Sequence, residues 1–204
     1  MILTINGKFI MPKANTLADG VIFPGPSFRT VVIDSGGVFA TQEWMAENLA
    51  IDDGGDGITA VNIGEVAGFN YGTQYFYTWD AAQRIAASLG NGWRVPTVND
   101  FVNLSNATAY ITGASYQNTA YQMKSTSGWI DSANGIDSVG VGINAPGYAA
   151  GINEGKEVWF WTSTIYAEPY GSCCKLYKNS GAFQWQNYVT KNSSESVRLV
   201  RDVV

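Results

Sequence analysis

The chain has 204 residues and a mass of 22.0 kDa, enough for one domain with a sizeable core. Hydrophobic residues make up 46% and charged residues 14%, which is typical of a globular chain and excludes a largely disordered one. The net charge of −5 argues against a nucleic-acid partner, because phosphates favour a basic face. The absence of histidine excludes Ser-His-Asp and Cys-His catalysis and removes the commonest transition-metal ligand.

Residues 1–27 are predicted to form an N-terminal arm for attachment or oligomerisation, followed by a domain over residues 28–204. The arm has short apolar runs and ends in "FPGPSF", where Pro24 and Pro26 disfavour a helix and a central strand. We identify no signal peptide at the N-terminus, and no stretch has the roughly 18 apolar residues of a membrane span.

A hairpin is predicted over residues 29–49, "RTVVIDSGGVFATQEWMAENL", because a Gly-Gly turn separates two strand-like runs. The segment Asp52–Gly57, "DDGGDG", has the aspartates and glycines of a calcium loop but not the spacing of an EF-hand. We interpret it as a solvated turn.

Two helices have clear boundary signals. The first follows Thr78 as N-cap and stops at Gly90, and the second opens where Thr97 and Asp100 have the spacing of a capping box. A further helical turn or two is predicted in "NTAYQMKS".

Strands are predicted after Gly135, in "SVGVGINA", "EVWFWTST", "CCKLYK", "AFQWQNY" and "SVRLVRD". Helices first and strands after indicate an α+β domain.

The stretch Thr164–Ser196 is unusually polar: 14 of its 33 residues are Tyr, Ser, Asn or Gln. Strand alternation divides it into an inward set, Leu176, Phe183 and Trp185, and an outward set, Cys173, Lys175, Tyr177, Gln184 and Gln186. Three more residues are expected in flanking loops: Tyr170, Tyr188 and Asn192. Rigid tyrosines among small polar residues are the composition of an antibody paratope, so we predict that the last two sets bind a ligand. The alternative is an ordinary polar face of an antiparallel hairpin.

Several stretches together resemble the Fibrobacter succinogenes major paralogous domain, a branch of the C-type-lectin-like fold. They are "WMAENL", "YGTQYFYTWDAA", "GWRVPTVNDFVNL", "GW", "WFWTST" and "VRLVRD", and the resemblance covers roughly residues 28 to 202. The resemblance implies two helices, short mixed or antiparallel strands and termini brought close together.

The resemblance also implies structural roles for the motif residues. The expected core rings are Trp44, Trp79, Trp93, Trp159 and Trp161, whose N–H groups need partners. Arg94 is expected to tie loop carbonyls rather than to bind an anion.

We predict no metal, no cofactor and no catalytic residue. Calcium-dependent lectins of the wider fold carry Glu-Pro-Asn or Gln-Pro-Asp with Trp-Asn-Asp, whereas this chain has only "EPY" at Glu168–Tyr170. Formylglycine-generating enzymes share the fold but need a spaced pair of cysteines, and Cys173 and Cys174 are adjacent. We expect both thiols to be free, because a disulfide between neighbours is strained.

Within this fold the chain is similar to the variable proteins of diversity-generating retroelements in phages and gut bacteria. The resemblance implies a variable region at about 164–196 that recognises a protein or glycan on a bacterial cell surface. The expected location is a phage virion at the tail tip or a bacterial surface, with oligomerisation through the arm. The alternative is an adhesin or glycan-binding domain of fixed specificity.

Overall fold

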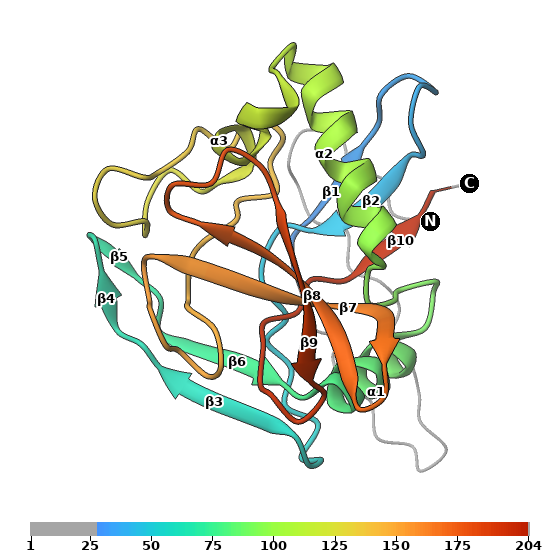
Figure 1. Cartoon of the computed structure of the whole chain (residues 1–204), viewed down its shortest axis with the longest axis vertical. Coiled ribbons are helices and arrows are strands. Elements are labelled where there is room, and N and C mark those ends of the chain that lie inside the picture. The colour runs from blue at the N-terminus through green and yellow to red at the C-terminus, as the bar shows by residue number, and fades with distance from the viewer. Residues whose placement is uncertain (1–27, 204) are drawn as a thin grey trace.

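The computed structural model describes residues 28–203, so the predicted arm lies outside the described residues (Figure 1). The helices are α1 (Trp79–Leu89), α2 (Val98–Thr112) and α3 (Thr119–Met123), with a 3₁₀ turn at Tyr116–Asn118. All strand pairs are antiparallel and form four small sheets. The strands are β1 (Thr30–Ile33), β2 (Gln42–Met45), β3 (Ile58–Asn62), β4 (Glu65–Val66), β5 (Phe69–Asn70), β6 (Thr73–Tyr77), β7 (Glu157–Ala167), β8 (Tyr170–Tyr177), β9 (Gln184–Thr190) and β10 (Val200–Asp202). The predicted α+β class is confirmed.

One sheet joins the two ends of the described chain. Its order is β1-β2-β10, so the first and last strands both pair with β2 (Figure 1). Val31 and Val200 lie opposite Trp44 from the two sides, and the Trp44 ring is buried. The predicted hairpin at residues 29–49 is therefore present, and β10 completes it.

Both predicted helix starts are confirmed. Thr78 caps α1 by accepting a hydrogen bond from the Ala81 backbone N–H, and Gly90 ends the helix at a φ of 61°. Thr97 and Asp100 form the predicted capping box at the start of α2. Local cap chemistry thus determines where these helices begin.

The expected structural role of Arg94 is confirmed, but its partners are carboxylates of the chain and not loop carbonyls. The Arg94 guanidinium donates two hydrogen bonds, of 2.6 and 2.9 Å, to the Asp100 carboxylate and a third, of 3.1 Å, to Asp202. Burial acts to raise the pKa of Asp100, but hydrogen bonds from Arg94, Thr97 and Gln42 outweigh it and hold that pKa at about 2. Arg94 therefore ties the start of α2 to β10 through carboxylates of the chain itself.

The region between residues 58 and 77 contains strands that the sequence analysis did not predict. β3 pairs with β6, and the short strands β4 and β5 form a hairpin between them. β3 is half exposed, so it lacks the apolar run of a buried strand. Conversely, residues 138–145 form no named strand, because Gly140 and Gly142 adopt positive φ values of 77° and 51° and turn the chain.

The core consists of two hydrophobic clusters that meet at the sheet β7-β8-β9. Phe160, Cys174 and Leu176 belong to a first cluster with α2, whereas Trp161 and Cys173 belong to a second cluster with α1. Neighbouring residues of β7 and β8 thus point into different clusters, as strand alternation requires. In the described part of the chain, no helix is both long and apolar enough to cross a membrane.

Candidate ligand-binding surface

The polar C-terminal stretch folds into the sheet β7-β8-β9, with β8 in the centre. Trp159, Lys175 and Gln184 lie opposite one another across the three strands, which places them on one face, called here the outer face. The inner face carries residues that are fully buried in the first cluster: Val158, Phe160, Cys174 and Leu176.

The predicted inward set is confirmed. Leu176 and Phe183 are buried, and the half-buried Trp185 packs against the first cluster. Of the outward set, Gln184 is exposed while Tyr177 and Gln186 are half-buried on the outer face. Alternation therefore predicts the correct side of the sheet for all of these residues.

The expectation that Cys173 and Lys175 are exposed is wrong. Both are on the outer face, but Cys173 is 0% exposed and Lys175 is 8% exposed. α1 and Val197 cover the sheet around Cys173 in the second cluster. Cys173 and Cys174 are free thiols, as predicted, and burial raises the pKa of each well above its usual value. Cys173 is therefore a core residue that cannot contact a ligand.

Lys175 is the centre of a packed group that we call the lysine cluster: Trp159, Lys175, Tyr177 and Gln186. The Lys175 Nζ donates to Gln186 Oε1 at 2.9 Å and lies 4.9 Å from the Trp159 ring centroid and 5.2 Å from that of Tyr177. Tyr148 stacks on Trp159 at 4.7 Å. The ammonium is thus held between rings, so the expected core ring Trp159 is half-buried under a cation.

A buried carboxylate lies beside this cluster. Glu195 is 1% exposed and accepts hydrogen bonds from Ser193 Oγ at 2.6 Å and from the Ala149 backbone N–H at 3.0 Å. Burial is the main cause that raises its pKa to about 7, and the neighbouring Glu157 adds to the rise. These contacts fix the loop at residues 148–150 against the segment that follows β9.

Three tyrosines meet at the open end of the sheet, and we call them the tyrosine cluster: Tyr166, Tyr170 and Tyr188. The ring centroids of Tyr166 and Tyr188 lie 4.3 Å apart, and those of Tyr170 and Tyr188 lie 5.9 Å apart. Tyr188 donates a 2.6 Å hydrogen bond to the Tyr166 hydroxyl. Tyr188 is 60% exposed and Tyr166 is 47% exposed, so both rings face solvent. Tyr166 is not among the residues predicted from the sequence, although it lies two positions before the "EPY" turn.

A β-bulge orients Tyr188. Gly171 lies opposite Val189 and Cys173 lies opposite Gln186, so β9 has two residues where β8 has one. Tyr188 adopts a φ of 64°, and the bulge turns Val189 back into the second cluster. Tyr188 was expected in a flanking loop, but it lies within β9, at the bulge, with its ring exposed to solvent.

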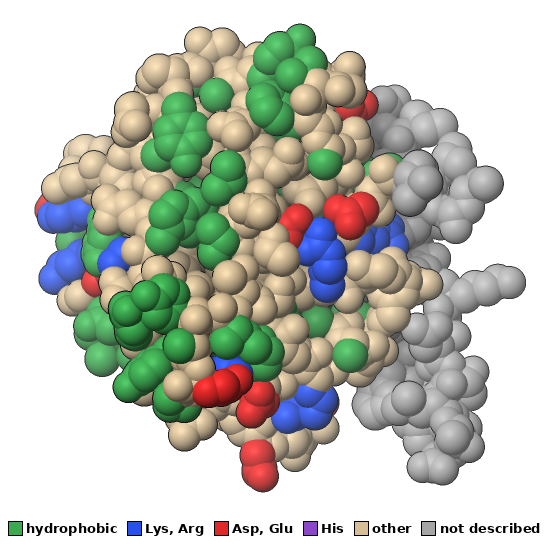
Figure 2. All heavy atoms as spheres, turned by 45° about the vertical axis from the view of Figure 1, so that its right-hand side comes forward, with side chains coloured by type: hydrophobic (Ala, Val, Ile, Leu, Met, Phe, Trp, Pro, Cys, Tyr) green, Lys and Arg blue, Asp and Glu red, His purple; other side chains and the backbone are tan. Residues whose placement is uncertain are grey.

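Asn192 lies in the turn after β9 and is exposed, as the prediction of a flanking loop requires. The adjacent Lys191 pairs with Glu168 at 2.6 Å and lies over the Trp79 ring, which connects this turn to α1 and to the β7–β8 turn. The face of the molecule in Figure 2 is mostly uncharged polar side chains and backbone, with hydrophobic patches and scattered charges of both signs. Within residues 28–203, no three metal-ligating side chains group together.

The structure defines an α+β domain whose last sheet is sealed on one face and presents polar and aromatic side chains on the other. The family profile of the Fibrobacter succinogenes major domain matches residues 39–201, and the chain belongs to this family. Searches of curated proteins and of solved structures found no significant match.

Proposed function

We propose that the protein is a non-catalytic binding protein that recognises its ligand with the exposed residues at the open end of the sheet β7-β8-β9 and on the exposed part of its outer face. The observation that carries this proposal is the tyrosine cluster, in which Tyr166 and Tyr188 are exposed at the edge of an ordered sheet with a buried opposite face. On the outer face Gln184 is exposed and Tyr177 and Gln186 are half-buried, and Asn192 is exposed in the turn after β9.

Physical chemistry supports binding by such a surface. A tyrosine presents a large ring with few rotatable bonds, so little conformational entropy is lost when it contacts a partner. The sealed inner face holds the strands in place, so the outer side chains are positioned before the ligand arrives. A protein or a glycan on a bacterial cell surface is a suitable ligand for this mixture of rings, amides and hydroxyls.

The buried cysteines favour binding over catalysis. A catalytic thiol must be accessible and have a lowered pKa, whereas both thiols here are fully buried and have raised pKa values.

The finer proposal is a C-type-lectin-like scaffold whose region 164–196 is diversified by a retroelement. Family membership supports it, and so does the position of the polar stretch between the Trp-rich start of β7 and the final strand β10. The test is the genomic neighbourhood. We expect a reverse-transcriptase gene and a near-copy of the 3′ end of the coding sequence that differs at adenines. If both are absent, the fixed-specificity adhesin or glycan-binding domain replaces this proposal.

Residues 1–27 are proposed to attach or oligomerise the domain on a virion or cell surface. Light scattering of the full chain and of a chain without residues 1–27 measures the mass of each. Equal oligomeric states would contradict an oligomerising role.

A ligand screen tests the binding proposal itself. An array of bacterial surface proteins and glycans probed with the full chain is expected to give a specific ligand. Tyr188→Ala should weaken that binding by about 2 kcal/mol, the effect typical of a hot-spot tyrosine. The matched control is Tyr121→Ala, which removes an exposed tyrosine from α3, outside this sheet. Equal binding by the Tyr188→Ala variant and the wild type would contradict the proposed surface.

A further inference from the structure

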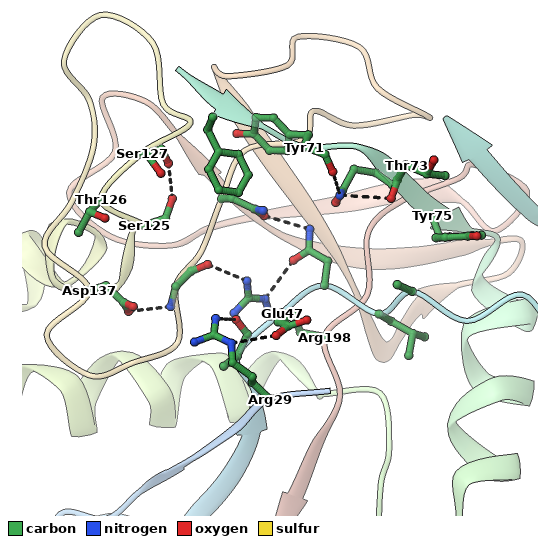
Figure 3. Close-up of a pocket in the computed structure, with 18 residues that line it drawn as sticks. Arg29, Glu47, Tyr71, Thr73, Tyr75, Ser125, Thr126, Ser127, Asp137 and Arg198 are labelled. Atoms are coloured by element: carbon green, nitrogen blue, oxygen red, sulfur yellow. Dashed lines mark hydrogen bonds and ion pairs between the residues drawn. The ribbon is translucent and has the colours of Figure 1, made fainter. Parts of the chain in front are cut away.

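A second candidate site lies away from the sheet β7-β8-β9. A polar cavity of about 400 Å³ is lined by segments that are distant in sequence, and none of its lining residues belongs to β7, β8 or β9. Figure 3 shows Arg29, Glu47 and Arg198 on one side, Ser125, Thr126 and Ser127 on a second, and Tyr71, Thr73 and Tyr75 around the remainder. Its volume is within the range of small-molecule sites, about 300–1,000 Å³.

The floor of the cavity is fixed by the chain itself. Arg198 is 2% exposed and donates to Asn48 Oδ1 at 3.0 Å, to the Gly142 carbonyl at 3.0 Å, and to the carbonyls of Met45 and Val141. All four acceptors are uncharged oxygens. The site is therefore preformed, because its central side chain needs no ligand to hold it.

Hydrogen bonding runs outward from this floor into the cavity. Asn48, the acceptor of the Arg198 bond, donates from Nδ2 to Asn144 Oδ1 at 3.3 Å. The Asn144 Nδ2 amide has no partner among the described residues. In such a series of hydrogen bonds each bond polarises the next group, so the Asn144 amide is a stronger hydrogen-bond donor at the cavity wall.

The remaining wall offers groups that both donate and accept. Within residues 28–203, no side-chain partner is found for the hydroxyls of Thr73, Tyr75, Thr126 and Ser127. Gln74 uses its Nε2 on the Tyr71 and Thr73 carbonyls, which leaves its Oε1 open as an acceptor. The half-buried rings of Phe69 and Tyr75 add apolar surface between these polar groups.

The charges of the lining cancel. Arg29 forms an ion pair with Glu47 at 2.8 Å. The other two charged residues of the lining, Arg198 and Asp137, have opposite signs, so the four charges sum to zero. Asp137 is itself occupied, because its Oδ1 accepts from the Gly142 backbone N–H at 2.6 Å. A cavity with no net charge neither attracts nor compensates an ionic ligand. The lining instead matches a neutral molecule with many hydroxyls and apolar ring faces.

We propose that this cavity binds a neutral mono- or disaccharide, with Asn144 donating to sugar hydroxyls, Gln74 accepting from them, and Phe69 or Tyr75 packing against the sugar ring. This site is separate from the proposed surface on β7-β8-β9.

The test is a titration of the ¹⁵N-labelled full chain, followed by amide chemical shifts, with galactose, mannose, N-acetylglucosamine and lactose. Glucuronate and inorganic phosphate serve as charged probes. We expect at least one neutral sugar to shift the amides of Ser125–Ser127 and Asn144, with a dissociation constant of about 1 mM or tighter. No shift at these amides with any neutral sugar, or shifts with the charged probes alone, would overturn the proposal.

Two variants locate the sugar. Thr126→Trp fills the cavity from an exposed position and Asn144→Ala removes the donor, so each should weaken binding by about tenfold or more. Ala87→Trp, at an exposed position on α1, is the matched control and should bind normally. Tyr188→Ala should also bind the sugar normally. If Tyr188→Ala abolishes the shifts while Thr126→Trp retains them, the sugar lies on the sheet and the cavity proposal fails. Failure of the sugar titration with array binding intact overturns only the cavity site.

Discussion

The two faces of the sheet β7-β8-β9 are made by the same strands but differ in how completely other elements cover them. The inner face is sealed by the first cluster around Phe160, Cys174 and Leu176. The outer face is covered by the second cluster at Cys173, half covered at the lysine cluster and exposed at Gln184. The tyrosine cluster lies beyond the sealed part, at the open end of the sheet, where Tyr170 faces away from Cys173. Alternation decides which face a side chain is on, whereas the elements packed against that face decide whether it meets solvent.

The largest expected effect is on the sealed face. Phe160→Ala should lower the free energy of unfolding by about 3–5 kcal/mol, because the fully buried ring stacks on Phe101 and its removal leaves a cavity. Urea unfolding measures this change. Gln184→Ala on the exposed face is the matched control, and an equal loss for both variants would contradict the difference between the faces.

The next largest effect on the free energy of unfolding is expected at Glu195, and it depends on pH. Its pKa is raised from the ordinary value of 4.5 to about 7 in the folded state, so the folded protein holds the proton more tightly than the unfolded chain. The resulting stabilisation is fully present below about pH 4.5 and is lost as the pH rises through 7. Glu195→Gln should therefore stabilise the protein at pH 8 by up to about 3 kcal/mol relative to wild type, and not at pH 4.

Thermal melts across this range test the prediction. Glu65→Gln, at an exposed carboxylate, is the control and should leave the pH profile unchanged. A wild-type profile that Glu195→Gln does not alter would show that the buried carboxylate does not titrate in this window.

A smaller effect distinguishes the covered part of the outer face from the open part. Cys173→Ser places a hydroxyl in the second cluster and should cost about 1–3 kcal/mol, although the residue is on the same face as Gln184. In the native protein, neither thiol should react with a disulfide reagent until the chain unfolds. Rapid labelling of the folded chain would mean that Cys173 is open to solvent.

The smallest effect is expected at the open end. Tyr188→Ala should change the free energy of unfolding by no more than about 0.5 kcal/mol, because its ring is 60% exposed and packs against Tyr166 and Tyr170 at the surface. A loss approaching that of Phe160→Ala would assign the tyrosine cluster to the core.

The sequence predicted those features of the fold that depend on local chemistry. Caps at Thr78 and Thr97 and the turn between β1 and β2 are encoded by a few neighbouring residues, and all three are present. β3 was missed because its half-exposed strand carries no strong apolar pattern, and its partner β6 was missed although Phe76 and Tyr77 are fully buried.

The candidate site was predicted only in part. The side of each β8 and β9 residue followed from alternation, but the cover over Cys173 comes from α1, about ninety positions earlier, which no local pattern reveals. The bulge at Tyr188 and the contact with Tyr166 depend on strand register. The cavity at Arg198 is assembled from separate segments between residues 29 and 198, so it appears only once the chain is folded.

The central claim is that the exposed residues at the open end and on the outer face of the sheet β7-β8-β9 can vary without loss of the fold. The most direct measurement is a display library in which Tyr166, Tyr170, Gln184, Tyr188 and Asn192 are randomised together, scored for protease resistance and for binding to the ligand that the array identifies. A matched library randomises inner-face residues: Val158, Phe160, Cys174, Leu176 and Phe183. We expect most variants of the first library to resist the protease while losing or changing binding, and most inner-face variants to be cleaved. Equal cleavage of the two libraries, or binding that survives randomisation of the first set, would contradict this account.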